Sequence, residues 1–329
     1  MAKVKWGIIS TAKIARLHVI PGIQAGARGE VYALASRDLA QAQAVAQELG
    51  IPKAYGSYEA LLADPDVQAV YNPLPNHLHV PWAIKAAEAG KHVLCEKPLG
   101  LDAAEAAKLV QVCRAKGVLL MEAFMYRLHP QWVAAKQMVK EGKIGELRAI
   151  QTSFSYMNRD AANIRNRADL PGSGGIMDIG CYPISLSRFL FDAEPQRVVA
   201  LVNRDPVLQI DSLTSAVLEF AEGHATFTCS TQLTPYQRVN IFGTAGRIEI
   251  EIPFNAPEFS PTKVYYETEA GLETITIDTV HQYQIEVDLF AQAILEGTRT
   301  PIAPEDAIAN MKVIDAVFRS EKSRAWENV

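Results

Sequence analysis

One stretch decides the fold of the N-terminal part of the chain: Trp6-Gly7-Ile8-Ile9-Ser10-Thr11-Ala12-Lys13-Ile14-Ala15. It predicts a buried apolar strand, a tight turn and the start of a helix. In turns of this kind that bind the phosphates of a dinucleotide, positions 10, 12 and 15 usually hold glycines, and here they hold Ser, Ala and Ala. Small side chains still allow close approach, and the hydroxyls of Ser10 and Thr11 could donate to phosphate oxygens. An ordinary turn of small residues stays as the alternative.

The same order of strand, turn and alanine-rich helix recurs up to residue 122. Asp38 and Asp102 stand where they would cap two of the helices, and Asn76 is expected to cap a third that ends at Gly90. Strands that alternate with helices imply right-handed βαβ units, and therefore a doubly wound parallel sheet, the α/β Rossmann architecture. The further strands expected are Val31–Ala35, Ala69–Tyr71, His92–Cys95 and Val118–Met121.

Residues 123–329 follow a different pattern. Short turns such as Ala221–Gly223 and Thr244–Gly246 join segments rich in β-branched residues, which predicts hairpins and a large, mostly antiparallel open sheet. Two helices are expected at the end of the chain, so this part is α+β. The sequence thus predicts a dinucleotide-binding domain over 1–122 and a substrate-binding and oligomerisation domain over 123–329. The expected strands are Leu147–Tyr156, Arg197–Asn203, Leu213–Phe220, Ala225–Gln232, Val239–Ile252 and Lys263–Ile277, and the helices Gln284–Glu296 and Pro304–Lys322.

Composition and charge exclude several classes of protein. The 329 residues carry a net charge of −5, divided as 13 − 11 = +2 over residues 1–122 and 19 − 26 = −7 over the rest, so no nucleic-acid partner is expected. No apolar run is long enough to span a membrane. The four cysteines form no Cys-x-x-Cys, which favours a reduced, cytoplasmic protein. His77 and His79 are two residues apart and no cysteine is near them, so no metal site is expected.

The end of the second expected strand bears on the choice of cofactor. It reads Ala35-Ser36-Arg37-Asp38, with a hydroxyl and a guanidinium where NAD enzymes have an acid for the ribose. An Arg suits the 2′-phosphate of NADP, so NADP is favoured over NAD. Arg37 could also be a solvated loop residue, and Asp38 is better explained as a helix cap.

Chemistry is expected at the carboxyl ends of the parallel strands, where three segments meet. These are Asn72–His77, Glu96-Lys97-Pro98 and Glu122–Arg127. Near a cationic nicotinamide and away from water, the pKa of Lys97 should fall toward neutrality, which would make Lys97 a usable base. A salt bridge at the strand end is the alternative for Glu96 and Lys97. His77 would either contact the cofactor ribose or cap the helix.

A glycine-rich stretch, Gly172–Tyr182, supplies the other candidate groups. If it is helical, Asp178 and Tyr182 are four residues apart and share a face, although Pro183 limits that geometry. A tyrosine beside a lysine cation can act as an acid or base. A glycine-rich turn with a helix cap and a packed tyrosine is the alternative.

These segments together resemble the glucose-fructose oxidoreductase/inositol dehydrogenase/rhizopine catabolism (Gfo/Idh/MocA) family. The motifs that carry the resemblance are Gly7–Ala15, Ser36-Arg37, Asn72–His77, Ala89–Val93, Glu96-Lys97-Pro98 and Gly174–Tyr182. The stretch Ile51–Glu59 is similar to dihydrodiol dehydrogenases and NADP-linked D-xylose dehydrogenases of that family. The resemblance implies that Lys97 and Tyr182 share the proton transfer, with their order left open, and that Asp178 orients the substrate or Lys97.

The cofactor-binding set expected on this basis comprises Ser10, Thr11, Ala12, Lys13, Ile14, Ser36, Arg37, Asn72, Pro73, Leu74, His77, Glu96, Lys97 and Arg165. The resemblance implies an NADP-dependent oxidoreductase for a hydroxyl or carbonyl carbon of a sugar, cyclic polyol or dihydrodiol. It also implies a homodimer or homotetramer formed through the C-terminal sheet. Two other functions are considered: a regulator that binds NAD(P) without chemistry, and a reductase of a conjugated pigment or imine.

Overall fold

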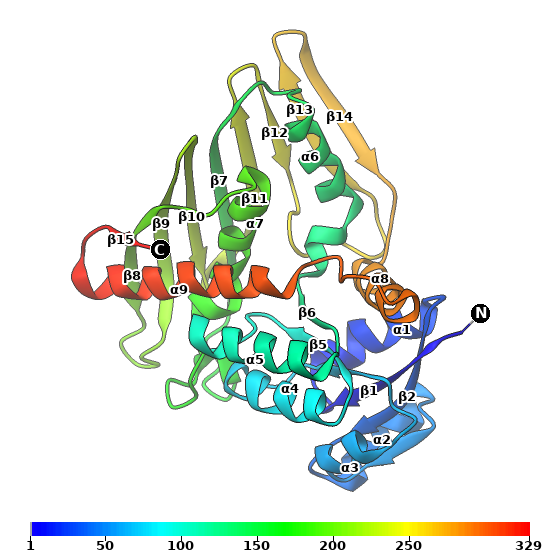
Figure 1. Cartoon of the computed structure of the whole chain (residues 1–329). Coiled ribbons are helices and arrows are strands. Elements are labelled where there is room, and N and C mark those ends of the chain that lie inside the picture. The colour runs from blue at the N-terminus through cyan, green and yellow to red at the C-terminus, as the bar shows by residue number, and fades with distance from the viewer. Residues whose placement is uncertain (1) are drawn as a thin grey trace. The chain divides into compact units, whose positions relative to one another are not determined.

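The computed structural model describes residues 2–329, which form two compact units. The first unit consists of the chain up to Met125 together with His281–Ile308, and the second of Tyr126–Val280 with Ala309–Val329. Helix α8 (Gln282–Glu296) therefore belongs to the first unit, although it follows the strands of the second in sequence. It packs against α1 and against strands β1 and β2 (Figure 1).

The first unit contains a six-stranded parallel sheet in the order β3-β2-β1-β4-β5-β6, which confirms the predicted doubly wound fold. The order reverses between β1 and β4, and ligands of such sheets bind beside that point. The strands are β1 Val4–Ile9, β2 Gly29–Ala35, β3 Lys53–Tyr55, β4 Ala69–Asn72, β5 His92–Glu96 and β6 Leu120–Ala123. The helices are α1 Ile20–Ala25, α2 Leu39–Leu49, α3 Tyr58–Ala63, α4 His79–Glu88 and α5 Ala103–Lys116, in addition to α8.

Helix starts in the first unit follow the capping signals in two places and depart from them in two others. The Asp38 carboxylate accepts from the N–H groups of Ala40 and Gln41, and Asp102 accepts from Glu105, so both caps are confirmed. Asn76 instead begins a 3₁₀ turn, Asn76–Leu78, and α4 starts only at His79. The first helix is preceded by a π-helical turn, Ala15–Val19.

The second unit contains a nine-stranded sheet in the order β14-β13-β12-β11-β7-β10-β9-β8-β15, which is antiparallel except for the pair β7 and β10. The predicted open, mostly antiparallel sheet is thus confirmed. The expected strands Val239–Ile252 and Lys263–Ile277 each prove to span a turn between two strands. The strands are β7 Leu147–Met157, β8 Arg197–Arg204, β9 Asp211–Phe220, β10 Gly223–Ser230, β11 Gln232–Gly243, β12 Gly246–Ile250, β13 Thr262–Thr268, β14 Gly271–Ile277 and β15 Glu327–Asn328.

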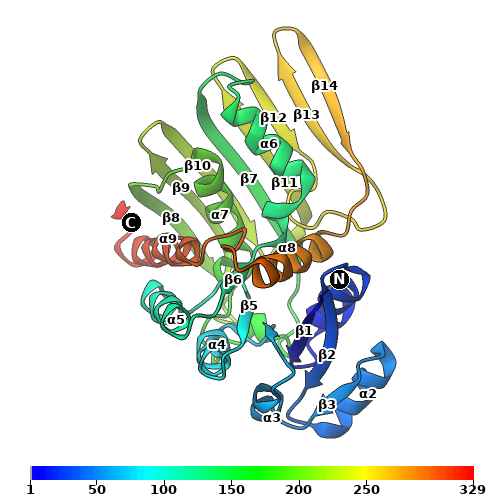
Figure 2. The ribbon, with the colours of Figure 1, turned by 45° about the vertical axis from the view of Figure 1, so that its right-hand side comes forward.

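Helix α6 (Pro130–Lys140) was not expected, and α7 (Cys181–Phe191) begins within the glycine-rich stretch for which a helix was considered. Both lie on one face of the sheet, where α6 contacts β13 and α7 contacts β7 (Figure 2). Helix α9 (Pro304–Ser323) begins in the first unit and ends in the second. Over residues 2–329, no helix combines the length and the apolar character that crossing a membrane requires.

Candidate active site

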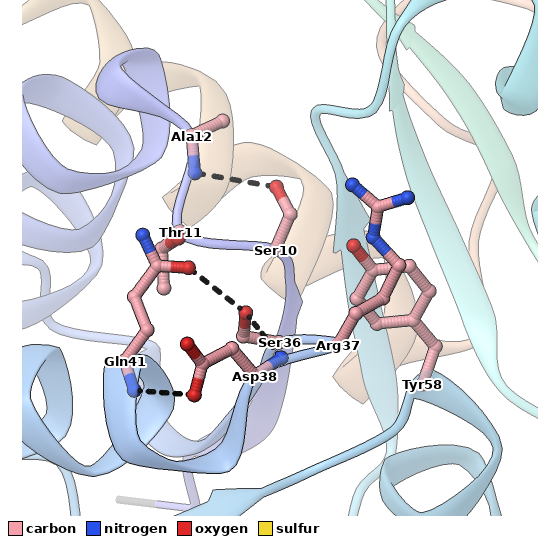
Figure 3. Close-up of a pocket in the computed structure, with 8 residues that line it drawn as sticks. All are labelled: Ser10, Thr11, Ala12, Ser36, Arg37, Asp38, Gln41 and Tyr58. Atoms are coloured by element: carbon pink, nitrogen blue, oxygen red, sulfur yellow. Dashed lines mark hydrogen bonds between the residues drawn. The ribbon is translucent and has the colours of Figure 1, made fainter.

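A cavity of about 520 Å³ lies beyond the ends of β1 and β2 in the first unit (Figure 3). It brings together five of the residues proposed for cofactor binding, from two separate turns. Lys13 and Ile14 continue the first turn but do not line the cavity. The lining residues are Ser10, Thr11, Ala12, Ser36, Arg37, Asp38, Gln41 and Tyr58.

The first turn owes its shape to Ser10. This residue has φ +80°, the left-handed conformation that glycine usually supplies, and its N–H donates to the Ala35 carbonyl at 2.9 Å. Its Oγ accepts from the Ala12 N–H at 3.2 Å. The chain therefore turns where the family fingerprint has its first glycine, at a conformational cost of about 1–2 kcal/mol for a residue with a Cβ. The turn leaves the short side chains of Ser10, Thr11 and Ala12 on the cavity wall, which suits a phosphate.

The second turn holds a single cation against the cavity. The Asp38 carboxylate is engaged by two backbone N–H groups as the cap of α2, at 2.9 and 3.2 Å, and Ser36 Oγ donates to Gln41 Oε1 at 3.2 Å. Arg37 lies beside the Tyr58 phenol (Figure 3). Burial raises the pKa of Tyr58, and the Arg37 cation opposes that shift. A guanidinium next to hydroxyl and amide groups fits a phosphorylated adenosine ribose.

Asn72 and His79 connect the segments that follow β4 and β5. The buried Asn72 amide donates to the His79 carbonyl at 3.0 Å and its Oδ1 accepts from the Leu74 N–H at 3.3 Å, while Pro73 and Leu74 are buried as well. The ring of His79 lies 2.9 Å from the Pro98 carbonyl and 2.7 Å from the Leu74 carbonyl. Burial lowers the pKa of His79 to about 4, so a neutral ring donates to one carbonyl at a time. Sequence reasoning considered His79 only as a metal ligand and missed this bridging role.

The Glu96-Lys97-Pro98 turn is fixed from both sides. Glu96 Oε1 accepts from the hydroxyl of the fully buried Tyr71 at 2.6 Å, and the buried Glu122 accepts from the Leu99 N–H at 2.7 Å. Lys97 itself is half-buried. These contacts hold the backbone on either side of Lys97.

His77 presents a polar atom that the protein does not satisfy. Its Nδ1 is buried and has no hydrogen-bond partner within residues 2–329. A buried polar atom of this kind is normally paired, so it points to a ligand or water at this position. The capping alternative for His77 does not apply, because α4 starts after Leu78. No group of His, Cys, Asp and Glu side chains suited to a metal occurs in the described part of the chain.

In the second unit, the glycine-rich stretch folds around Asp211. Gly174 has φ +104°, and a Cβ there would overlap the Asp211 carboxylate. Asp211 accepts from the Ile176 N–H at 2.5 Å, and Ile176–Gly180 forms a π-helical turn that leads into α7. Pro183 is the third residue of α7, and the π-helical turn before it continues into α7 without a break. The helix therefore runs through the proline, and Asp178 lies one turn before Tyr182.

Asp178 is held by two donors. The Tyr156 hydroxyl donates to its Oδ2 at 2.5 Å and Arg165 Nε donates to its Oδ1 at 2.7 Å. Both donors favour the ionised carboxylate. Arg165, which was assigned to the cofactor or substrate, thus contacts Asp178 within its own unit. Tyr156 was not singled out from the sequence, because no local pattern links it to Asp178.

The Tyr182 ring lies in an aromatic cluster and is only 5% exposed. Its centroid is 5.7 Å from that of Tyr126, 5.6 Å from Phe154 and 5.1 Å from Phe254. Tyr126 is fixed in turn by donating to Ser185 Oγ at 2.9 Å. Such packing restricts the Tyr182 ring to one orientation, which a group that moves a proton requires.

Comparison with known proteins agrees with both units. Residues 4–124 match the model of the oxidoreductase family with an NAD-binding Rossmann fold, and residues 132–249 match the Gfo/Idh/MocA C-terminal domain. The chain belongs to the Gfo/Idh/MocA family. The resemblance inferred from the motifs is therefore confirmed, and the protein is an NAD(P)-dependent oxidoreductase with a cofactor-binding first unit.

Three relatives in this family cover most of the chain. D-xylose 1-dehydrogenase (NADP(+)) 2 of Haloferax volcanii is 42% identical and covers 97% of this chain and 98% of its own. Trans-1,2-dihydrobenzene-1,2-diol dehydrogenase of Mus musculus is 34% identical over 75% of this chain and 74% of its own. Among solved structures, KijD10, a 3-ketoreductase from Actinomadura kijaniata in complex with NADP and TDP-benzene, is 33% identical with TM-score 0.91, covering 97% of this chain and 98% of its own.

Proposed function

We propose that the protein is an NADP-dependent dehydrogenase or reductase of a sugar, cyclic polyol or dihydrodiol, acting on a carbon that carries a hydroxyl or carbonyl. The observation that carries the cofactor assignment is the second turn of the cavity. Arg37 is the one cation among the eight lining residues, and the nearest acid, Asp38, has its carboxylate engaged as a helix cap. A 2′-phosphate would meet a positive charge there, whereas the paired ribose hydroxyls of NAD would find that acid already engaged. The named NADP dependence of the xylose dehydrogenase and the NADP in KijD10 agree with this choice.

The proposed chemistry divides between cofactor and protein. The nicotinamide ring, when bound, accepts or donates the hydride, which is chemistry that no side chain supplies. The protein must move the hydroxyl proton, and we assign that step to Lys97 and Tyr182. Lys97 follows a strand end held by Glu122 and His79, and Tyr182 is oriented by its aromatic neighbours. Asp178, whose ionised form is stabilised by hydrogen bonds from Arg165 and Tyr156, is the acceptor proposed for a substrate hydroxyl.

The substrate class follows from the relatives and from the groups of the second unit. Xylose and the dihydrodiol named for two relatives both carry neighbouring hydroxyls on a compact carbon frame. An ionised carboxylate such as Asp178 accepts hydrogen bonds from hydroxyls. A neutral polyhydroxylated substrate therefore suits this carboxylate.

We also propose a homodimer or homotetramer formed through the outer face of the nine-stranded sheet. That face carries a groove of about 450 Å³ lined by small hydroxyl and β-branched residues of β7 to β10, and Leu201 within it is 75% exposed. Exposed apolar surface of this kind marks interaction sites. Leu201→Lys should lower the mass measured by light scattering, and an unchanged mass would reject this face.

A substrate panel tests the proposed activity. Aldoses, inositols and dihydrodiols, and the matching ketones or lactones, are offered with NADP(H) and separately with NAD(H), and the nicotinamide absorbance is followed. We expect turnover with at least one sugar or diol and a higher kcat/KM with NADP than with NAD. No absorbance change with any member of the panel would overturn the proposed substrate class, and a preference for NAD would overturn the cofactor assignment.

A further inference from the structure

Helix α8 places an acid in the interior of the first unit that the proposed reaction does not use. Glu286 is 1% exposed, and its buried Oε1 has no hydrogen-bond partner within residues 2–329. A carboxylate in that position would have lost its water without gaining a donor, which costs several kcal/mol. The side chain is therefore stable there only as the neutral acid, and its burial raises its pKa well above the usual range.

The negative charge of another acid, Glu96, also raises the pKa of Glu286. Glu96 lies at the end of β5, where the Tyr71 hydroxyl donates to it at 2.6 Å. Both Glu96 and Glu286 in turn raise the pKa of Tyr71, so this phenol keeps its proton and acts as a donor. The hydrogen bond from Tyr71 identifies Glu96 as the ionised member of the two acids.

Among the described residues, no cation opposes the rise in the pKa of Glu286. The titratable groups that face this cluster are Glu96 from β5, Tyr71 from β4 and Tyr283 from α8 itself, and the Tyr283 ring stacks on His18 at 5.0 Å. When two carboxyl groups repel one another in a buried site, the state in which one of them keeps its proton is favoured. Lys97 directly follows Glu96 in the chain.

We propose that Glu286 is a positioning acid that keeps a proton beside Glu96, so that the pair carries one negative charge behind Lys97, and that release of this proton to solvent sets the upper pH limit of the reaction. Lys97 must be neutral to accept the hydroxyl proton. A second negative charge behind it would favour the ammonium form and leave it unable to do so. The kinetic part of this inference rests on the proposed function, and the protonation of Glu286 does not.

The protonation is tested on the protein without cofactor or substrate, by infrared difference spectroscopy between wild type and Glu286→Gln. We expect the C=O stretch of a buried carboxylic acid at neutral pH in the wild type and its loss in the variant. Absence of that band would overturn the proposal, whatever substrate the enzyme has. Because this measurement needs no activity, its failure is distinct from failure of the proposed function.

The consequence for Lys97 is tested by the pH dependence of kcat in the oxidative direction. In Glu286→Gln the neutral amide replaces the neutral acid, so we expect a rate within about threefold of wild type at neutral pH and an alkaline limb extended by about one pH unit. Glu286→Leu is a second variant that removes the same titration without a buried donor, and it should extend the limb equally. Glu296→Gln, an exposed acid near the end of the same helix, should leave the profile unchanged. Coincident profiles for wild type and both Glu286 variants would overturn the proposal.

Discussion

Two acids of the second unit and two acids of the first receive hydrogen bonds in different ways. In the second unit, Asp178 receives hydrogen bonds from Arg165 and Tyr156, and Asp205 receives them from Arg159 and two backbone N–H groups. In the first unit, Glu96 receives one from a phenol, and no hydrogen bond reaches the buried Oε1 of Glu286 from the described residues. Fixed anions suit the recognition of hydroxyl groups, whereas a buried acid that receives no hydrogen bond can hold and release a proton near neutral pH. We therefore propose orientation of the substrate for Asp178 and storage of a proton for Glu96 and Glu286, beside the proton transfer proposed for Lys97 and Tyr182.

The most severe way to break this comparison is to remove the base that we assign to the first unit. Lys97→Met keeps an unbranched side chain of similar size without the amine, and it should lower kcat by about 10²–10⁴-fold, the usual contribution of a positioned acid or base. Binding of NADP to the variant should remain measurable by fluorescence titration, because the cavity that Arg37 lines is unchanged. Lys85→Met, which removes a surface lysine of α4, is the control. A near-normal kcat would remove Lys97 from the mechanism.

The corresponding change in the second unit acts on orientation. Asp178→Asn keeps the shape of the side chain but replaces the anion that pairs with Arg165, so kcat/KM should fall about tenfold to a hundredfold. Tyr156→Phe removes only one of the two donors and should cost less. Arg167→Met provides the matched control, because Arg167 pairs with Asp169 of the same loop. If Asp178→Asn matched the control, the carboxylate would have no part in orienting the substrate.

One acid of the second unit departs from the comparison and sharpens it. Asp211 is buried against Gly174, and burial raises its pKa to about 7 although it accepts the Ile176 N–H. Its folded pKa lies above the unfolded value of about 3.9, so its contribution to stability is complete below about pH 4 and is lost as the pH rises through 7.

The contribution of Asp211 to the free energy of unfolding falls by about 2 kcal/mol over this range, which is about half of what the full pKa shift would give. Asp211→Asn should flatten the fall in the free energy of unfolding between about pH 4 and 7, measured by urea titration at each pH. An unchanged slope in the variant would show that Asp211 is ionised in the native protein.

Those features of the first unit that depend on residues close together in the chain could be predicted from the sequence. The alternation of strands and helices predicted the parallel sheet, and Asp38 and Asp102 marked the starts of two helices because capping depends on residues two or three positions away. The Glu96-Lys97-Pro98 turn stood out for the same reason, since strand end, charges and proline are contiguous. Ser10 was expected in the first turn, but its left-handed backbone follows from the fold and not from the residue type.

What the sequence could not provide were partners brought together from distant segments. His79 bridges two carbonyls from separate strand ends, and the charge of Glu96 acts on Glu286 because α8 belongs to the first unit. Asp211 on β9 lies against Gly174 of the glycine-rich stretch, and the Tyr156 hydroxyl on β7 donates to Asp178. None of these pairs has a characteristic spacing in the sequence, so hydrophobic periodicity and turn residues could not predict them.

The mildest test of the comparison concerns Arg37, a cation at the edge of the first unit that binds rather than reacts. Arg37→Ala should weaken NADP binding by about 1–2 kcal/mol, the value of a charge-assisted hydrogen bond at a half-open site, and should leave NAD binding unchanged. The loss should shrink as salt is added, because the interaction with a 2′-phosphate is electrostatic and partly solvated. Arg28→Ala, which removes a cation paired with Glu296 in the same unit, controls for net charge. Equal losses for NADP and NAD would mean that Arg37 supports the turn and does not read the phosphate, and the cofactor preference would then have to come from Ser36 and Gln41.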